Sequence, residues 1–211
     1  GVITKGIGGF YYVLSEGEVY ECKARGILRL RGKTPLTGDR VEISEDEGGT
    51  FTIDKILPRL NSFERPPVAN VEMKIYVISR ADPLPSLALL DRMLVSGEES
   101  GAELAICVSK CDLSEGIPPE EIVSIYSRLY PVFPVSMTEM RGISELKSAL
   151  LGKTAALSGP SGVGKSTLLN ALLGEYASPT GRISERTLRG RHTTRHTELF
   201  AGDGFYMFDT P

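Results

Sequence analysis

Residues 159–167 read GPSGVGKST and fit the phosphate-binding pattern G-x-x-x-x-G-K-[ST]. The apolar run TAALS precedes the motif, and STLLNALLG (166–174) begins at its last two residues. This order predicts a strand, a glycine-rich turn and a helix over residues 166–174. Glycine lets the backbone approach phosphate oxygens closely, and the amino end of a helix favours an anion. We therefore expect nucleotide phosphates to be bound by Gly159, Pro160, Ser161, Gly162, Val163, Gly164, Lys165, Ser166 and Thr167.

Two side chains of this loop have expected roles in chemistry. Lys165 should reach the β- and γ-phosphates, and the Ser166 hydroxyl should bind Mg²⁺. The loop alone leaves the nucleotide undecided, because transporter ATPases, nucleotide kinases and GTPases share it. Those proteins place most of their remaining machinery after the loop, whereas only 44 residues follow Thr167. The rest of the site is therefore expected upstream.

The composition is that of a globular chain of one or two domains, with 211 residues, 41% of them hydrophobic, and a net charge of −3. No apolar run approaches the roughly 18 residues that a membrane span needs, so we expect a soluble protein without a membrane partner. The cysteines Cys22, Cys107 and Cys111 lack the spacing of zinc ligands and indicate reduced thiols in a cytoplasmic protein.

The chain divides into two halves with different patterns. Residues 1–66 hold short runs rich in β-branched and aromatic residues, separated by turn sequences, and show no sustained helical period. About five strands in that length predict a small all-β barrel of the OB-fold kind. The prolines of RPPVAN (65–70) interrupt the pattern, and we place the boundary between domains 1–66 and 67–211 there.

In residues 67–211, apolar strand runs alternate with amphipathic helical segments, beginning with KIYVIS (74–79). This alternation predicts an α/β domain with a mostly parallel sheet and helices on both faces. In such sheets the functional residues follow the carboxyl ends of the strands.

VSKCD (108–112) ends a later strand and resembles the base-reading motif [NT]-K-x-D of GTPases. Asp112 would accept two hydrogen bonds that guanine donates and adenine cannot, and the Lys110 stem would cover the ring. Ser109 stands where asparagine or threonine is usual, and Cys111 is the variable position. Because the pattern is short, an exposed turn at a strand end is the alternative interpretation.

A second strand end, PVFPVSM (131–137), follows about 25 residues after the first. Ser136 stands where GTPases carry the loop that contacts guanine O6, and Met137 replaces the usual small residue. We expect both residues to lie at the base.

Two segments after residue 167 resemble Mg²⁺-binding elements. RGRHTTRHTEL (189–199) resembles switch I, in which Thr194, or alternatively Thr193, would bind the ion, although a plain basic loop would also fit. Asp209, near the end of FYMFDTP, resembles the aspartate of the D-x-P-G motif, which holds Mg²⁺ through water.

The elements therefore occur in the order base reader, base loop, phosphate loop, switch I and Mg²⁺ aspartate. Ordinary GTPases begin with the phosphate loop and finish with the base reader, so this order indicates circular permutation. A permuted chain can assemble the same site, since the termini of a domain often lie close together.

The motifs TGDRV (37–41), RPPVANV (65–71), SKCD, GPSGVGKST and GRHTTR together resemble the RsgA (YjeQ) family. These proteins are circularly permuted GTPases of late small-subunit maturation. The resemblance implies an enzyme that hydrolyses GTP to GDP and phosphate with Mg²⁺ and is stimulated by the small (30S) ribosomal subunit. It also implies contact between the OB-fold and 16S rRNA, and a carboxy-terminal zinc domain outside this chain. We expect a cytoplasmic monomer.

Catalysis and RNA binding each have a candidate set. His192 is the candidate for orienting the attacking water, as the resemblance also implies, and an RNA-facing or solvated histidine is the alternative. The segment 23–40 contains six basic residues against one acidic residue, Asp39, and could bind an RNA backbone or be ordinary surface; the basic residues are Lys23, Arg25, Arg29, Arg31, Lys33 and Arg40. Two further functions stay open at this point, a P-loop nucleotide kinase and a nucleotide-gated RNA-assembly module in which hydrolysis is incidental.

Overall fold

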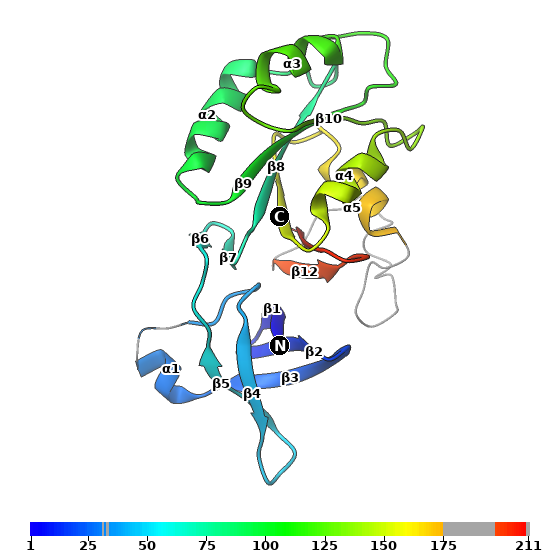
Figure 1. Cartoon of the computed structure of the whole chain (residues 1–211). Coiled ribbons are helices and arrows are strands. Elements are labelled where there is room, and N and C mark those ends of the chain that lie inside the picture. Colours follow the sequence, from blue (N-terminus) through cyan, green and yellow to red (C-terminus); the bar gives the residue numbers. More distant parts are fainter. Residues whose placement is uncertain (31, 33, 175–196, 210–211) are drawn as a thin grey trace. The chain divides into compact units, whose positions relative to one another are not determined.

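The computed structural model describes residues 1–30, 32, 34–174 and 197–209 (Figure 1). Contacts group the described residues into two units. The first contains residues 1–71 with 197–201 and 208–209, and the second contains residues 72–174 with 202–207. The grouping changes between Val71 and Glu72, a few residues after the boundary that we placed from the prolines.

The first unit is built around five strands, which are β1 (Val2–Ile7), β2 (Phe10–Ser15), β3 (Glu18–Ala24), β4 (Val41–Glu45) and β5 (Phe51–Ile56). Their order in the sheet is β1-β2-β3-β5-β4, with β3 and β5 parallel and the other pairs antiparallel. Val2 also bridges Arg40, and the backbones of Gly1 and Val41 exchange two hydrogen bonds of 2.9 Å. The row of strands therefore closes on itself, which is the barrel expected for an OB-fold.

Alternating strand residues fill the barrel. Ile3, Val13, Cys22 and Ile53 are fully buried, as the period of two along each strand requires. One short helix, α1 (Gly26–Leu30), was not predicted; it is too short to show a helical period, and its Leu28 joins this core.

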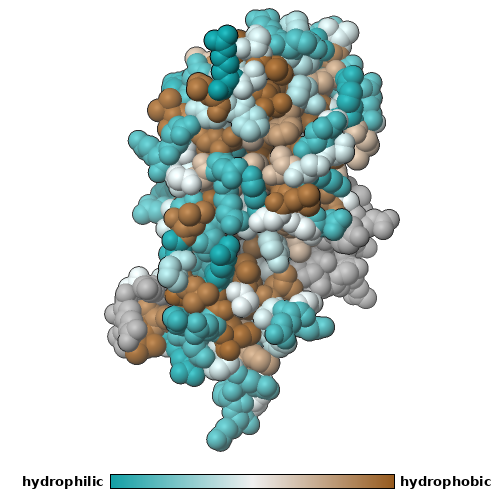
Figure 2. Space-filling model, in the orientation of Figure 1, coloured by the Kyte–Doolittle hydropathy of each residue, from teal (hydrophilic) through white to brown (hydrophobic). Residues whose placement is uncertain are grey.

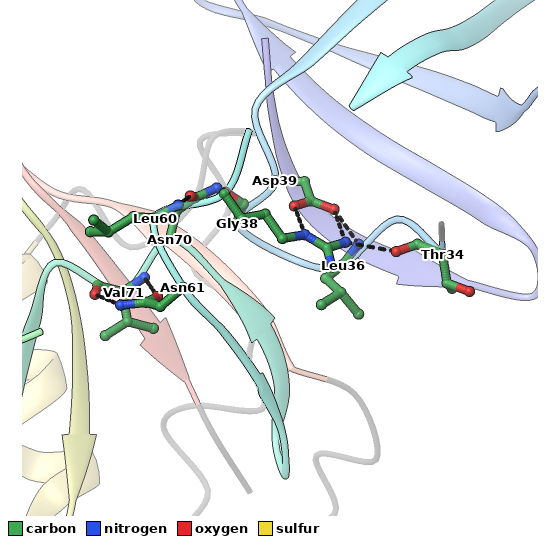
Figure 3. Close-up of polar contacts among 9 residues, drawn as sticks. Thr34, Leu36, Gly38, Asp39, Leu60, Asn61, Asn70 and Val71 are labelled. Atoms are coloured by element: carbon green, nitrogen blue, oxygen red, sulfur yellow. Dashed lines mark hydrogen bonds and ion pairs between the residues drawn. The ribbon is translucent and has the colours of Figure 1, made fainter. Parts of the chain in front are cut away.

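A buried ion pair holds the loop that leads into β4. The Asp39 side chain is fully buried and accepts from Nε and Nη2 of Arg59 at 2.7 and 2.8 Å (Figure 3). It also accepts from the Leu36 backbone at 2.7 Å, and Arg59 Nη2 donates to the Thr34 carbonyl at 2.8 Å. The carboxylate thus has several charge-assisted partners in place of water.

The segment RPPVAN is part of a hairpin of β6 (Ser62–Glu64) and β7 (Pro67–Ala69). Asn70 Nδ2 donates to the Gly38 carbonyl at 2.9 Å, and its Oδ1 accepts from the Leu60 backbone at 2.9 Å (Figure 3). Gly38 has φ +91°, and a Cβ there would lie 2.2 Å from the Ala69 carbonyl oxygen, so only glycine fits. The hairpin is thereby fastened to the loop that Asp39 holds.

A six-stranded sheet has the order β10-β9-β8-β11-β13-β12. Its strands are β8 (Met73–Ser79), β9 (Glu103–Ser109), β10 (Val132–Pro134), β11 (Thr154–Ser158), β12 (Glu198–Ala201) and β13 (Tyr206–Asp209). The pairs β10–β9, β9–β8 and β8–β11 are parallel, so the predicted mostly parallel sheet is confirmed.

Four helices accompany the strands of the second unit, namely α2 (Leu87–Glu98), α3 (Pro119–Tyr126), α4 (Ile143–Leu150) and α5 (Lys165–Leu173). Leu90 of α2 and Ile122 of α3 are fully buried in one cluster with Tyr76 and Ile78 of β8. Figure 1 shows α4 and α5 on the other side of these strands. Helices therefore cover both faces, as the alternating pattern predicted.

Polar and apolar side chains are interspersed on the face shown in Figure 2. Among the described residues, no helix is both long enough and apolar enough to span a bilayer.

We predict that Arg59→Met lowers the free energy of unfolding by about 3 kcal/mol, because it leaves the buried Asp39 carboxylate without its charged partner. Urea unfolding at pH 7 measures the change. The matched control is Lys55→Met, which removes an ion pair to Glu42 whose partners are both more than half exposed, and it should cost at most about 1 kcal/mol. Equal effects of the two substitutions would show that the Asp39 pair does not stabilise the barrel.

Candidate nucleotide-binding site

Four loops of the second unit follow the carboxyl ends of the parallel strands β8, β9, β10 and β11. Parallel strands end at the same edge of a sheet, so segments distant in sequence meet there. The phosphate loop follows β11, the predicted base reader overlaps the end of β9, and the predicted base loop follows β10.

The phosphate loop turns sharply from β11 into α5. At Gly159, φ is +153° and a Cβ would lie 2.2 Å from the Val77 carbonyl oxygen, so the loop needs glycine there. Helix α5 begins at Lys165, one residue before the predicted start. Ser161, Gly162, Ser166 and Thr167 are exposed, which makes them accessible to a ligand; Gly164 is half-buried and Val163 is buried.

The Lys165 ammonium lies inside this turn. Its Nζ donates to the carbonyl oxygens of Gly159 and Pro160, both at 2.8 Å. Burial lowers the pKa of Lys165, because a charged amine is less stable away from water. The negative charge of a phosphate at this place would favour the protonated amine again.

Ser109 joins the end of β9 to the phosphate loop. Its fully buried Oγ lies 2.6 Å from the Val163 carbonyl oxygen and 3.1 Å from that of Ile78. A hydroxyl donates one proton, and the shorter distance favours Val163 as the acceptor. The base-reading motif usually has asparagine or threonine at this position. Here a serine side chain makes the hydrogen bond that joins the end of β9 to the phosphate loop.

Asp112 and Ser136 lie beside each other. The Ser136 hydroxyl is the largest cause of a lowered pKa at Asp112, and the Asp112 amide, the Thr138 hydroxyl and the Arg141 charge act in the same direction. These groups stabilise the carboxylate, so Asp112 stays ionised below the usual pKa of an aspartate. Thr138 was missed by the sequence reasoning, although a hydroxyl two residues after Ser136 was a visible signal.

Backbone contacts fix the same arrangement. The Cys111 amide donates to the Val135 carbonyl at 3.1 Å, and Arg141 Nη2 donates to the Cys111 carbonyl at 3.0 Å. Ser136 and Arg141 exchange two backbone hydrogen bonds of 3.0 Å, which close the loop 136–141. The predicted base reader and base loop therefore form one substructure.

The side chains around Asp112 point in different directions. Cys111 is buried, its Sγ donates to the Val108 carbonyl at 3.2 Å, and burial raises the pKa of its thiol. Lys110 adopts a positive φ of 59° and its Nζ donates to the Asp82 carbonyl. Asp112 itself is exposed. The lysine and the aspartate are thus the accessible members of the motif.

Met137 approaches the phosphate loop from the base loop. Its Cε lies 3.0 Å from the place where a Cβ of Gly164 would stand. The structure therefore brings Ser109, Met137 and the phosphate loop together, and Asp112 belongs to the same cluster through Ser136.

The remaining predicted site residues lie in β13 or outside the described residues. Asp209 is the last residue of β13, the strand next to β11 in the sheet. His192, Thr193 and Thr194 lie outside the described residues. Within the described part of the chain, no group of three or more His, Cys, Asp or Glu residues is arranged to hold a metal ion. Cys22, Cys107 and Cys111 are free and buried.

Two family models match the chain. The model for the RsgA GTPase matches residues 56–211, and the model for the RsgA N-terminal domain matches residues 1–53.

Relatives and solved structures agree with these matches. The chain is 45% identical to the small ribosomal subunit biogenesis GTPase RsgA of Alkaliphilus metalliredigens and 45% identical to that of Geobacillus thermodenitrificans. All of the chain is covered in both cases, with 74% and 73% of the relatives. The crystal structure of YjeQ from Thermotoga maritima is 34% identical with a TM-score of 0.83, over all of this chain and 73% of that one. The crystal structure of YloQ, described as a circularly permuted GTPase, is 33% identical with a TM-score of 0.78, over all of this chain and 70% of that one.

We predict that Ser109→Ala lowers the free energy of unfolding by about 1–2 kcal/mol, since the buried Val163 carbonyl loses its donor. Thermal unfolding followed by circular dichroism measures the loss. Ser148→Ala is the matched control, because its exposed hydroxyl bonds a carbonyl within α4, and it should change stability by at most about 0.5 kcal/mol. If the Ser109→Ala chain were as stable as the unmodified one, the Ser109–Val163 hydrogen bond would not stabilise the fold.

Proposed function

This chain belongs to the RsgA family of circularly permuted GTPases, and we propose that it hydrolyses GTP in the biogenesis of the small ribosomal subunit. The observation that supports the proposal is the hydrogen bond from Ser109 to the Val163 carbonyl, which joins the proposed base-reading segment to the proposed phosphate loop encoded after it. The resemblance found in the motifs is confirmed by the family models. The matched family is one of GTPases, which argues against the nucleotide-kinase alternative.

Guanine is the proposed base. The Asp112 carboxylate would accept from guanine N1–H and the 2-amino group, and its lowered pKa favours the ionised form that accepting requires. Adenine offers no donor at N1 and has no 2-amino group, so the carboxylate would stay unpaired. The Lys110 stem would cover the ring, with Cys111 behind it, and the loop at Ser136 and Met137 would contact guanine O6.

The phosphate loop and Lys165 are proposed to neutralise the charge that develops on the transferred phosphoryl group. Mg²⁺ bound beside them would supply further neutralisation of the β- and γ-phosphates. Ser166 fits such an ion, because its exposed hydroxyl stands on the first turn of α5 and Mg²⁺ prefers oxygen ligands. Thr194 and Asp209 are the other proposed ligands. GTP and GDP are the proposed nucleotides.

His192 is proposed to orient the attacking water, with an RNA-facing role as the alternative. An imidazole with a pKa near neutrality can accept or hold a proton there. This residue, with Lys165, forms the proposed catalytic pair.

The small ribosomal subunit and its 16S rRNA are the proposed partners, because the relatives are named as small-subunit biogenesis GTPases. Residues 1–66 are proposed as the RNA-binding OB-fold domain and residues 67–211 as the GTPase domain. Lys23 is exposed beside the Phe10 ring, with its Nζ 5.2 Å from the ring centroid. A lysine over an aromatic ring suits RNA, which binds through both phosphate charge and base stacking. Arg25 pairs with Asp54 at 2.7 Å and is less available. A cytoplasmic monomer is proposed, and zinc is expected only in a domain outside this chain.

We predict that Asp112→Asn weakens GDP binding at least about 100-fold and improves binding of xanthosine diphosphate. The amide N–H can donate to the 2-oxo group of xanthine, whereas the 2-amino group of guanine is itself a donor. Competition of GDP, ADP and XDP for a fluorescent nucleotide measures both changes. Ser144→Ala, in the first turn of α4 with its hydroxyl on Glu145, is the control and should keep the guanine preference. The base assignment is wrong if Asp112→Asn still prefers GDP as strongly as the unmodified chain.

We predict that His192→Ala lowers small-subunit-stimulated GTP turnover by about 100-fold or more while GDP affinity is kept, since general acid–base groups contribute rates of that order. Multiple-turnover phosphate release with and without small subunits measures it. The other histidine, His196, supplies the control His196→Ala, which should turn over GTP at the unmodified rate. A stimulated rate within about threefold of the unmodified chain would exclude a chemical role for His192 and favour the RNA-facing one.

A further inference from the structure

The segment between β8 and α2, residues 80–86 (RADPLPS), lies at the same sheet edge as the site loops, although no motif assigned it to the site. The Arg80 amide donates to the Ser109 carbonyl at 3.1 Å. On the other side, Pro83 Cδ lies 3.6 Å from the place where a Cβ of Gly162 would stand. The segment therefore touches both the base reader and the phosphate loop.

The backbone carbonyl of Asp82 accepts two side-chain donors. Ser79 Oγ donates to it at 3.0 Å, and Lys110 Nζ donates to it as well. Ser79 is the last residue of β8 and is only 1% exposed, and its hydroxyl oxygen also accepts from the Ala81 amide at 3.3 Å. The Ser79 hydroxyl thus fixes the turn 79–82 and with it the place of the Asp82 carbonyl oxygen.

Lys110 is held at both of its ends. Its backbone has a positive φ of 59°, which is uncommon for a residue with a long side chain and persists only where neighbours fix it. Its ammonium is bound by the Asp82 carbonyl. A lysine side chain has many rotamers, so a hydrogen bond at its ammonium restricts the conformation of the whole methylene chain.

We infer that Ser79 is a positioning residue for the nucleotide, acting through the Asp82 carbonyl on the Lys110 stem. The inference rests on the proposed function, in which that stem covers the guanine ring. Loss of the Ser79 hydroxyl would leave the turn less fixed, and the Lys110 side chain would then be ordered only when the base binds. The entropy cost of that ordering would lower the affinity for the nucleotide. The effect therefore appears in nucleotide affinity and depends on the presence of Lys110.

A double-mutant cycle on the full chain tests this dependence, with a fluorescent GDP analogue as the probe. Ser79→Ala should weaken GDP binding about fivefold, as expected for one hydrogen bond that orders a binding group. In a Lys110→Met background the same substitution should change the affinity by less than about twofold, since residues acting through one contact are not additive. Equal losses in both backgrounds, or no loss in the first, would overturn the inference.

Ser86→Ala is the matched control from the other end of the same segment. The Ser86 hydroxyl accepts from the Leu89 amide at 3.3 Å and caps α2, so its loss should lower Tm and leave GDP affinity within about twofold. Should Ser79→Ala be too unstable to purify, Ser79→Cys takes its place in the cycle, because a thiol of similar size is a weaker donor. An unmodified chain that binds ADP as well as GDP would contradict the proposed function. Intact guanine preference with an uncoupled cycle would contradict the Ser79 role alone.

Discussion

The Ser109 hydroxyl is the contact on which the site depends. Its oxygen meets a carbonyl of β8 and one of the phosphate loop that follows β11, while Ser109 itself ends β9. These strands are neighbours in the order β9-β8-β11, so one buried group links three strand ends. In a low-dielectric interior such a bond is stronger than at the surface, and leaving the Val163 carbonyl unpaired is costly. The reversed order of the motifs has no consequence for a site that is assembled across a sheet in this way.

The network around Asp112 keeps an exposed carboxylate in its charged form, which accepts hydrogen bonds. Ser136, Thr138 and Arg141 stabilise its charged form from the side of the base loop. A group held in its accepting state before the ligand arrives needs little reorganisation on binding. In the proposed function, the base loop would therefore act on the nucleotide chiefly through Asp112.

Local patterns predicted the elements well and long-range contacts poorly. The start of α5 after the phosphate loop was predicted to within one residue, because glycine spacing and an apolar helix are visible in the local sequence. The barrel and the parallel sheet followed from strand periodicity. The Asp82 carbonyl left no sequence signal, because it acts through the backbone alone. The Thr138 hydroxyl was visible in the sequence, but its contacts could not be predicted because it lies in an irregular loop. The prolines of RPPVAN suggested an interruption, and asparagines that bond backbone groups turned the segment into an anchored hairpin.

The first unit draws residues from two distant parts of the sequence, and this affects the order in which its contacts form. Thr37 Oγ1 donates to the Thr197 carbonyl across 160 residues of sequence at 3.4 Å. Strands β1 to β5 leave the translating ribosome early, yet residues 197–201 and 208–209 of their unit are synthesised after all four helices of the second unit. Domains usually fold in the order of synthesis. The barrel strands can therefore close before residues 197–201 and 208–209 exist, whereas contacts such as that of Thr37 with Thr197 form only after the helices of the second unit have been synthesised.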